Sequence, residues 1–290
     1  MNVVIVGLGA IGSVYASAIF DAGIRMRVAV DDVRRERYKK EPFFFNDSRY
    51  DFEYFTPHDG DCAATLIILA TKATTYVDAL ELIEPVVGSQ SLILPLLNGL
   101  TSEQIAAQKY GWSRVLRGYY IGHTARCTSR KAYQDGSYRT PIGGTAEQLK
   151  VVSEIFDLAG IHYEVPQDII SSQWQKFIVN IGTNPPTAIF NVGYASLRAN
   201  PNMMAYSTAL MREAASLAVA LGVNGANEMV DNALKLIGTM NGEDRSSMLQ
   251  DVDAHRPTEI DIFAGEVCRL GESLGVATPL HIQMVQTWKF

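Results

Sequence analysis

A glycine-rich segment near the start of the chain has the spacing of a phosphate-binding loop. Gly7-Leu8-Gly9-Ala10-Ile11-Gly12 follows the pattern G-x-G-x-x-G. In such a loop the glycines allow a tight turn and a close approach of the backbone to a pyrophosphate, and the amides that open the following helix favour the anion. Because the pattern also occurs in plain strand-to-helix turns, its meaning depends on the flanking elements.

The residues on both sides of the motif supply that context. Residues 2–6 form an apolar run typical of a buried parallel strand, and apolar side chains recur at helical spacing from Ala10 to Asp21. Gly23 can provide the left-handed residue that ends such a helix. We therefore predict dinucleotide binding through the three glycines of the motif, Gly7, Gly9 and Gly12.

An acidic pair follows the next predicted strand, residues 26–30. A carboxylate such as Asp31 at this place accepts hydrogen bonds from the adenosine ribose and repels a 2′-phosphate, which favours NADH. Arg34 and Arg35 come shortly after it and could hold a 2′-phosphate instead, which would permit NADPH. A solvated first helical turn also explains these two arginines.

A second group of polar side chains lies in the later half of the chain. Lys176, Asn180 and Asn184 are spaced by one helical turn each, so a helix places them on one face. Pro185 and Pro186 lack backbone amides, and we expect the helix to kink or end there and to leave carbonyl groups unbonded. The stripe suits a ligand site, although an exposed amphipathic face with a proline stop fits the same residues.

Further polar motifs follow predicted strands or open predicted helices. They are Thr71-Lys72-Ala73, Leu97-Asn98-Gly99, Ser246-Ser247 and Thr258-Glu259-Ile260-Asp261. The first two follow apolar runs at 64–70 and 91–96, and the carboxyl ends of parallel strands are where open α/β sheets bind ligands. The last two also fit ordinary helix starts, with a capping hydroxyl and acids that answer the helix dipole.

In order and spacing, these motifs resemble those of the ketopantoate reductase family, which comprises 2-dehydropantoate 2-reductases and related D-2-hydroxyacid dehydrogenases. The resemblance runs from Gly7 to Glu259 and the helix beyond it. It implies that Lys176 is the general acid that protonates the substrate carbonyl oxygen, and that Glu259 positions substrate and lysine. A lysine with the ordinary pKa of ~10.4 is protonated at neutral pH and supplies both the proton and a stabilising charge.

The same resemblance assigns the remaining site residues. Asn180 and Asn184 match two asparagines that bind substrate or cofactor, and Ser247 matches the serine that holds the substrate carboxylate. Lys72 matches a residue near the adenosine phosphate, and Asn98 one near the nicotinamide ribose. Ser247 is chosen over Ser246 by its separation from Glu259 alone.

The elements that must position these residues fall into two domains. Strand and helix patterns alternate in the first half, whereas helical periodicity dominates after residue 168. We predict an α/β protein with an N-terminal Rossmann-type doubly wound sheet, residues 1–166, and a C-terminal all-helical domain, residues 167–290. Residues 114–144 are expected to form antiparallel strands that complete the sheet edge.

An aromatic segment, residues 43–55, interrupts the first domain. Its Asn-Asp-Ser centre predicts a turn between two short strands. Since few basic residues surround it, packing explains the aromatic side chains better than a base-stacking platform does.

Composition narrows the function classes. The chain has 290 residues with 25 Lys and Arg against 31 Asp and Glu, a net charge of −6, so nucleic acid is not an expected partner. The three cysteines, Cys62, Cys127 and Cys268, and the five histidines show no metal-ligand spacing, and we expect no metal. Without a membrane span or a signal sequence, we expect a cytoplasmic protein, with a homodimer as one possible assembly.

The predicted activity is the NAD(P)H-dependent reduction of a small 2-oxo acid, with 2-dehydropantoate as the leading substrate. One alternative is an NAD-dependent D-2-hydroxyacid dehydrogenase for bulkier branched or aromatic acids, which Asp31 favours. The other is a non-catalytic redox sensor, which would need the glycine loop but no proton donor.

Overall fold

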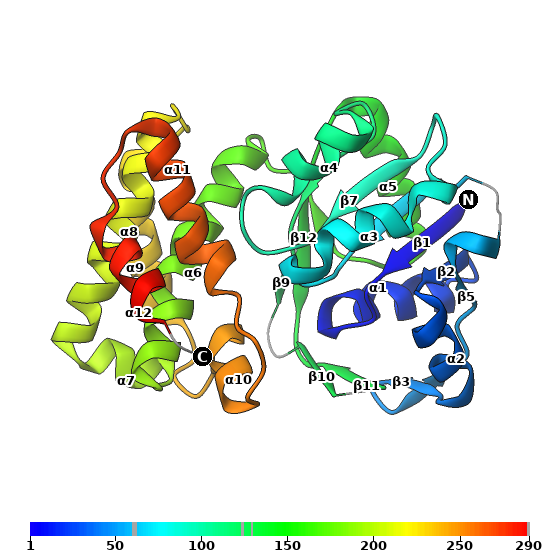
Figure 1. Cartoon of the computed structure of the whole chain (residues 1–290), viewed down its shortest axis with the longest axis horizontal. Coiled ribbons are helices and arrows are strands. Elements are labelled where there is room, and N and C mark those ends of the chain that lie inside the picture. Colours follow the sequence, from blue (N-terminus) through cyan, green and yellow to red (C-terminus); the bar gives the residue numbers. More distant parts are fainter. Residues whose placement is uncertain (60–62, 123–124, 129, 289–290) are drawn as a thin grey trace. The chain divides into compact units, whose positions relative to one another are not determined.

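The computed structural model describes residues 1–59, 63–122, 125–128 and 130–288. Cys62 and His123 therefore lie outside the described residues. The chain divides into two compact units, of which one comprises residues 1–97 and 101–169 and the other residues 98–100 and 170–290. Figure 1 labels most of the helices and strands of both.

The first unit is built on a parallel sheet with the strand order β5-β2-β1-β6-β7. The strands are β1 (Asn2–Val6), β2 (Arg25–Ala29), β5 (Tyr54–Phe55), β6 (Leu66–Leu69) and β7 (Leu92–Pro95). This order reverses direction between β1 and β6, which is the switch point where doubly wound sheets bind ligands. The predicted Rossmann-type sheet is confirmed, with β5 as an additional strand that the sequence pattern did not separate from the aromatic segment.

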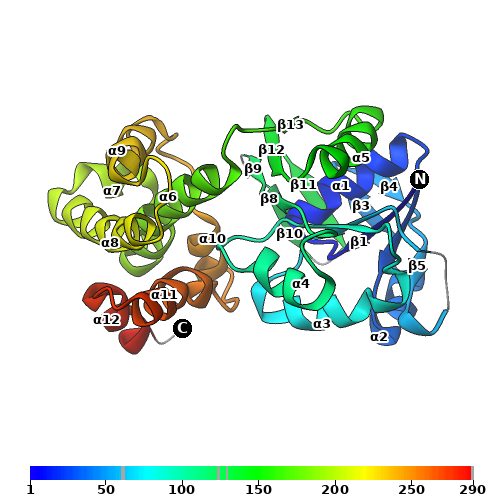
Figure 2. The same cartoon turned by 90° about the horizontal axis from the view of Figure 1, so that it is seen from above.

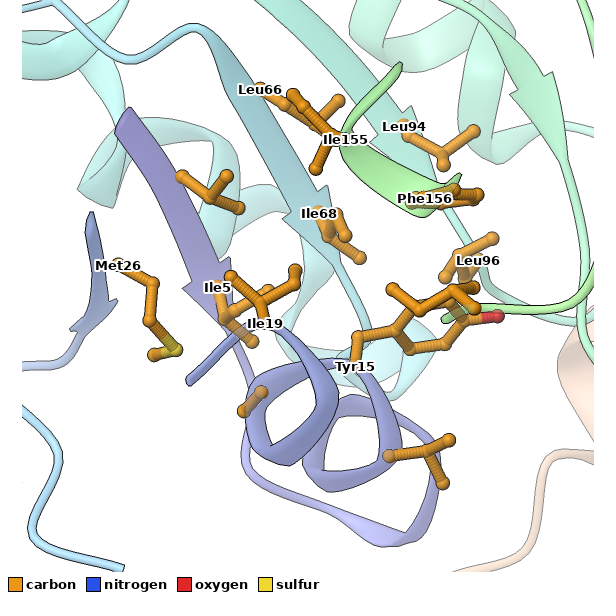
Figure 3. Close-up of a cluster of buried hydrophobic side chains, with 14 of the residues drawn as sticks. Ile5, Tyr15, Ile19, Met26, Leu66, Ile68, Leu94, Leu96, Ile155 and Phe156 are labelled. Carbon is orange, nitrogen blue, oxygen red and sulfur yellow. The ribbon is translucent and has the colours of Figure 1, made fainter. Parts of the chain in front are cut away.

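Helices cover both faces of this sheet (Figure 2). They are α1 (Ala10–Asp21) and α5 (Ala146–Leu158) on one face, and α3 (Tyr76–Leu82) and α4 (Ser102–Tyr110) on the other. Figure 3 shows the first of these interfaces, where Tyr15, Ile19 and Phe156 pack on Ile5 and Ile68. Burial of such side chains stabilises the fold by about 1.5–3 kcal/mol each. By contrast, α2 (Asp32–Lys40) has no buried residue.

The aromatic segment forms a hairpin, as predicted. β3 (Phe43–Phe45) and β4 (Ser48–Tyr50) are joined at Asn46 and Asp47, whose φ angles of 46° and 62° suit a tight hairpin turn. The buried Arg130 lies 3.8 Å from the centre of the Tyr38 ring and 5.1 Å from that of Phe43. The aromatic side chains are thus engaged in packing within the unit.

Residues 114–144 do not complete the edge of the main sheet, contrary to our expectation. Strands from this range join strands from elsewhere in two other sheets, β10-β11-β3-β4 and β13-β12-β8, with β9 also paired to β12. The strands are β8 (Arg117–Gly118), β9 (Ile121–Gly122), β10 (Ala125–Thr128), β11 (Lys131–Gln134), β12 (Tyr138–Gly143) and β13 (Tyr163–Glu164). β11 and β12 each pair with a strand on both sides, so their backbone hydrogen-bonding groups are already engaged. Residue Ile93 of the edge strand β7 pairs with Val115 from this range, through one parallel bridge.

The second unit is helical, as predicted. Its helices are α6 (Ile169–Phe190), α7 (Tyr194–Ala199), α8 (Pro201–Ala220), α9 (Met229–Thr239), α10 (Ser247–Asp253), α11 (Glu266–Leu274) and α12 (Pro279–Thr287). A π-helical turn, η5 (Asp261–Gly265), precedes α11. Among the described residues of both units, short 3₁₀ turns lie at η1 (Pro57–Asp59), η2 (Ala73–Thr75), η3 (Glu84–Val86) and η4 (Ala226–Glu228).

Of the kink or end expected at the double proline, the end does not occur, because α6 continues through Pro185 and Pro186 to Phe190. The threonine hydroxyls on either side add hydrogen bonds within the helix, although not to the carbonyls of Ile181 and Gly182, which lose their amide donors. Thr183 Oγ1 donates to the carbonyl of Val179 over 2.8 Å, and Thr187 Oγ1 donates to that of Thr183 over 2.7 Å. Every residue from 181 to 188 is buried, so tertiary packing maintains the helix where local sequence would end it.

Candidate active site

The glycine loop lies between β1 and α1, as predicted. At two of its positions, the surrounding backbone leaves no room for any residue larger than glycine. Gly7 has φ +95°, and a Cβ there would lie 2.6 Å from the carbonyl oxygen of Ala70 at the end of β6. A Cβ on Gly12 would lie 1.9 Å from the oxygen of Gly7. Gly9 differs, since a Cβ there would meet nothing within 4 Å. Packing does not require this glycine, and the open space above it suits the close approach of a ligand.

The start of α1 also fits a bound phosphate. Gly9 is the N-cap residue, no side chain caps the helix, and its first turn contains no acid. The first amides of α1 can therefore donate to an anion. Thr71, in the chain after β6, has a buried hydroxyl oxygen with no hydrogen-bond partner among the described residues, and the next residue, Lys72, is exposed. These features fit the diphosphate of a dinucleotide.

Asp31 lies at the N-terminus of α2 and is engaged there. Its Oδ1 accepts the Arg34 amide over 2.6 Å, and its Oδ2 pairs with Arg34 Nη1 over 2.7 Å. Arg35 pairs with Asp59 over 2.7 Å. The Thr56 amide and the Arg35 guanidinium, which both donate to Asp59, hold the pKa of that carboxyl below its usual range. Both arginines that could hold a 2′-phosphate thus have carboxylate partners.

Three predicted site residues come together in the helical unit. Lys176 Nζ donates to Asn98 Oδ1 over 3.3 Å, and Asn98 Nδ2 donates to Glu259 Oε2 over 3.1 Å. All three side chains are half-buried. Asn98, which the resemblance placed near the nicotinamide ribose, therefore lies between the candidate acid and the candidate carboxylate.

The acids near residue 259 have side-chain partners of their own, and Asp261 also lies in the first turn of the helical run, as an acid answering the helix dipole would. Glu259 precedes the first helical residue, Ile260, and its carboxylate accepts the Asn98 amide. Asp261 pairs with Arg269 over 2.9 Å.

The rest of the stripe on α6 is also drawn into the unit. Asn184 is buried, and its Nδ2 donates to Ser247 Oγ over 3.2 Å. Asn180 is half-buried, and its side-chain amide makes no hydrogen bond with another described residue. The stripe is therefore not an exposed amphipathic face, and the Asn180 amide retains donors and an acceptor for a ligand.

The two neighbouring serines have different surroundings. Ser246 is buried, accepts the Leu249 amide over 3.1 Å as the N-cap of α10, and lies 2.6 Å from Thr187 Oγ1. Ser247 is exposed and contacts Asn184. Its hydroxyl is the one of the pair with access to a ligand.

Sequence patterns did not single out one buried acid beside these residues. Glu266, at the start of α11, is 1% exposed and accepts the Leu100 amide over 2.9 Å. In the sequence, Glu266 looks like any glutamate on the solvent-facing side of a helix. Only its contact with the Asn98–Leu100 segment in the structure distinguishes it.

A Rossmann-type sheet with an open glycine loop and a helical unit with a polar lysine site define the class of two-domain, nicotinamide-dependent oxidoreductases. Residues 3–147 match the family model described as ketopantoate reductase PanE/ApbA, and residues 168–290 match its C-terminal counterpart. The chain belongs to the ketopantoate reductase family, whose members are oxidoreductases acting on a keto group. The resemblance predicted from the motifs is confirmed.

Individual relatives match the chain over nearly their whole lengths. The chain is 26% identical to the 2-dehydropantoate 2-reductase of Vibrio cholerae, covering 100% of this chain and 97% of that one. It is 28% identical to the Aquifex aeolicus enzyme of the same name, covering 97% and 94%.

Solved structures share the fold. A 2-dehydropantoate 2-reductase from Geobacter metallireducens superposes with a TM-score of 0.85 at 21% identity, covering 99% of this chain and 98% of that one. D-mandelate dehydrogenase, solved with NADH and anilino(oxo)acetate, gives 0.86 at 22% identity, covering 99% and 96%. Within the described ranges, no helix is long and apolar enough to cross a membrane, and no group of three or more His, Cys, Asp or Glu side chains could hold a metal ion.

Proposed function

We propose that the chain reduces 2-dehydropantoate to pantoate with NADH, using Lys176 as the general acid. The observation that carries the proposal is the arrangement in which Asn98 links the Lys176 ammonium to the Glu259 carboxylate. A redox sensor needs a dinucleotide loop but has no use for an oriented proton donor. The curated relatives from V. cholerae and A. aeolicus, both 2-dehydropantoate 2-reductases, support the choice of substrate.

The polar residues of the helical unit account for the chemistry on the substrate side. When bound, the nicotinamide supplies the hydride that the carbonyl carbon accepts. Lys176 donates a proton to the carbonyl oxygen as negative charge develops there. Asn98 restricts the direction of the ammonium, and Glu259 provides the compensating negative charge. After the reaction the lysine regains its proton from solvent.

Recognition of the substrate carboxylate falls to Ser247 and the amides of α6. The Ser247 hydroxyl is exposed, and Asn184 Nδ2 fixes the orientation of its oxygen by donating to it. The Ser247 proton is then directed away from Asn184 and can donate to a carboxylate oxygen. Asn180 is half-buried, and its side-chain amide, which makes no hydrogen bond with another described residue, offers a second donor.

NADH is the proposed cofactor because of Asp31 and its partner. A 2′-phosphate near the Asp31 carboxylate would meet like charge, and it would have to displace Asp31 from Arg34 to gain a cation. The glycine loop and the start of α1 bind the diphosphate, and Lys72 lies beside its adenosine end. We also propose a homodimer in the cytoplasm, in line with the ketopantoate reductase from Staphylococcus aureus described as dimeric; light scattering on the purified protein tests the assembly.

A substrate and cofactor panel tests this function. Steady-state rates are measured with 2-dehydropantoate, phenylpyruvate and 2-oxoisocaproate, each with NADH and with NADPH. We expect the highest kcat/KM for 2-dehydropantoate with NADH. Turnover of the two larger acids alone would contradict the substrate and support a D-2-hydroxyacid dehydrogenase, and no turnover of any acid would contradict the enzymatic function.

A further inference from the structure

Glu266 is a buried carboxylate packed directly against the Asn98–Leu100 segment. Its Oε1 accepts the Leu100 amide over 2.9 Å, and the side chain is 1% exposed. Gly99 has φ +93°, and a Cβ at that residue would lie 2.9 Å from Glu266 Oε2. The backbone of the segment can approach the carboxylate this closely because residue 99 is a glycine.

Two glutamates on either side of one π-helical turn hold the same short segment. Glu259 accepts the side-chain amide of Asn98, and Glu266 accepts the backbone amide of Leu100. The turn between them is η5, and π-helical turns are frequent at functional sites. The segment belongs to the helical unit, although the residues before and after it belong to the other unit. The hydrogen bonds to these two carboxylates connect the Asn98–Leu100 segment to the helical unit.

We infer that Glu266 is a positioning residue for the proposed reaction, which acts by fixing the Asn98–Leu100 backbone so that Asn98 orients the Lys176 ammonium. The inference rests on the proposed function. Burial of a carboxylate is unfavourable unless hydrogen bonds compensate for it, and an apolar side chain of similar volume is often at least as stable. A glutamate at this position is therefore explained by the precise placement of a backbone amide better than by packing alone.

The orientation of Asn98 depends on that backbone. Its amide oxygen faces Lys176 and its nitrogen faces Glu259. If the segment moves, the contacts of Asn98 with Lys176 and with Glu259 both lengthen, and the ammonium is no longer oriented by the Asn98 oxygen. A misplacement of about 1 Å at an active site can lower the rate by about 100-fold.

Substitutions at residue 266 test the inference. E266L removes the acceptor, E266Q keeps an acceptor oxygen, and E272A is a matched control on the exposed side of α11. For E266L we expect kcat to fall by about 10- to 100-fold while KM stays within about 3-fold of the wild-type value. E266Q should lie within about 5-fold of the wild type and E272A should equal it. An E266L enzyme with wild-type kcat would overturn the inference.

A double-mutant cycle separates positioning from general damage. If Glu266 acts through Asn98, N98A and N98A/E266L should have kcat values within about 3-fold of each other, because the second change removes what the first has already lost. Fully additive losses would contradict the inference. If E266L fails to fold, as judged by thermal unfolding, E266D replaces it, since aspartate keeps the charge but is too short to reach Leu100.

A readout that is independent of turnover distinguishes this inference from the proposed function. Amide hydrogen exchange of the unliganded protein should be faster at Leu100 in E266L than in the wild type, and unchanged in E272A. Equal exchange in all three would overturn the positioning role even in an active enzyme. Conversely, a wild type that reduces no 2-oxo acid but shows this difference in exchange would overturn the proposed function alone.

Discussion

Lys176 Nζ donates a hydrogen bond to Asn98 Oδ1 over 3.3 Å. The other end of the same amide donates to Glu259 over 3.1 Å, so charge determines the orientation of the asparagine. A flipped amide would direct its NH₂ group at the ammonium and its oxygen at the carboxylate, which loses both hydrogen bonds. The lysine is thus held by a group that accepts a hydrogen bond from it without taking its proton.

The first prediction concerns the proton donor. K176A should lower kcat by about 10²- to 10⁴-fold, since it removes a general acid and the charge that stabilises the developing oxyanion. NADH binding, measured by quenching of protein fluorescence, should stay within about 2-fold because the glycine loop is unchanged. A variant with wild-type turnover would contradict the mechanism.

The second prediction concerns the carboxylate. E259Q removes the negative charge but leaves an oxygen that can accept the Asn98 amide, and we expect kcat to fall by about 10-fold or more as the ammonium loses its compensating charge. D261N is the control, because Asp261 lies close in sequence but pairs with Arg269 on the surface. Equal losses in both variants would show that general destabilisation, not the charge of Glu259, accounts for the effect.

Local patterns predicted much of this molecule, because the determining interactions are close in sequence. The strand at residues 2–6, the glycine turn and the helix from Ala10 to Asp21 follow from apolar periodicity and Gly23 alone. The double proline shows the limit of such reasoning, since the burial of α6 among its neighbours outweighs the local preference to end. A sequence pattern describes a segment, whereas that burial depends on distant residues.

The candidate site shows the same limit. The spacing of Lys176, Asn180 and Asn184 predicts a shared helix face, but no pattern indicates that Asn98 meets the first of them. That contact joins residues far apart in the chain. The buried role of Glu266 was missed for the same reason, because its partner Leu100 is equally remote.

The third prediction separates the two serines. S246A should lower the free energy of unfolding by about 0.5–2 kcal/mol through loss of the α10 cap, with little change in KM. S247A should raise KM for the 2-oxo acid by about 10-fold, because it removes one hydrogen bond to a charged group. The midpoint of thermal unfolding should not change. The opposite pattern would assign substrate binding to Ser246.

The fourth prediction addresses cofactor preference. D31S keeps an N-cap oxygen for α2, removes the carboxylate and releases Arg34 from its ion pair. The ratio of the Kd for NADPH to the Kd for NADH should fall by about 10-fold or more, because one repulsive charge is lost and one cation becomes accessible. D32S, at the adjacent residue, is the control. An unchanged ratio in D31S would show that Asp31 does not determine the choice.

The fifth prediction concerns stability at low pH. Glu213 on α8 accepts the amides of Leu280 and His281 over 2.9 and 3.2 Å, and its Oε2 lies 2.7 Å from Nδ1 of the fully buried His281. Burial alone would raise the pKa of Glu213, but the hydrogen bonds from His281 and the two amides outweigh it and hold the pKa below its usual value. These contacts attach the start of α12 to α8.

The sign of the pH dependence follows from that lowered pKa. A carboxyl group with a depressed pKa in the folded state contributes stability above its unfolded pKa of ~4.3, and the contribution is lost as the pH falls through the folded value. E213Q should therefore cost about 1.5–3 kcal/mol at pH 7, and the difference from the wild type should shrink below about pH 4. Urea unfolding of both proteins from pH 7 down to pH 3 measures this. A difference that stays constant across the range would mean that the charge of Glu213 contributes nothing and that the contacts stabilise α12 by shape alone.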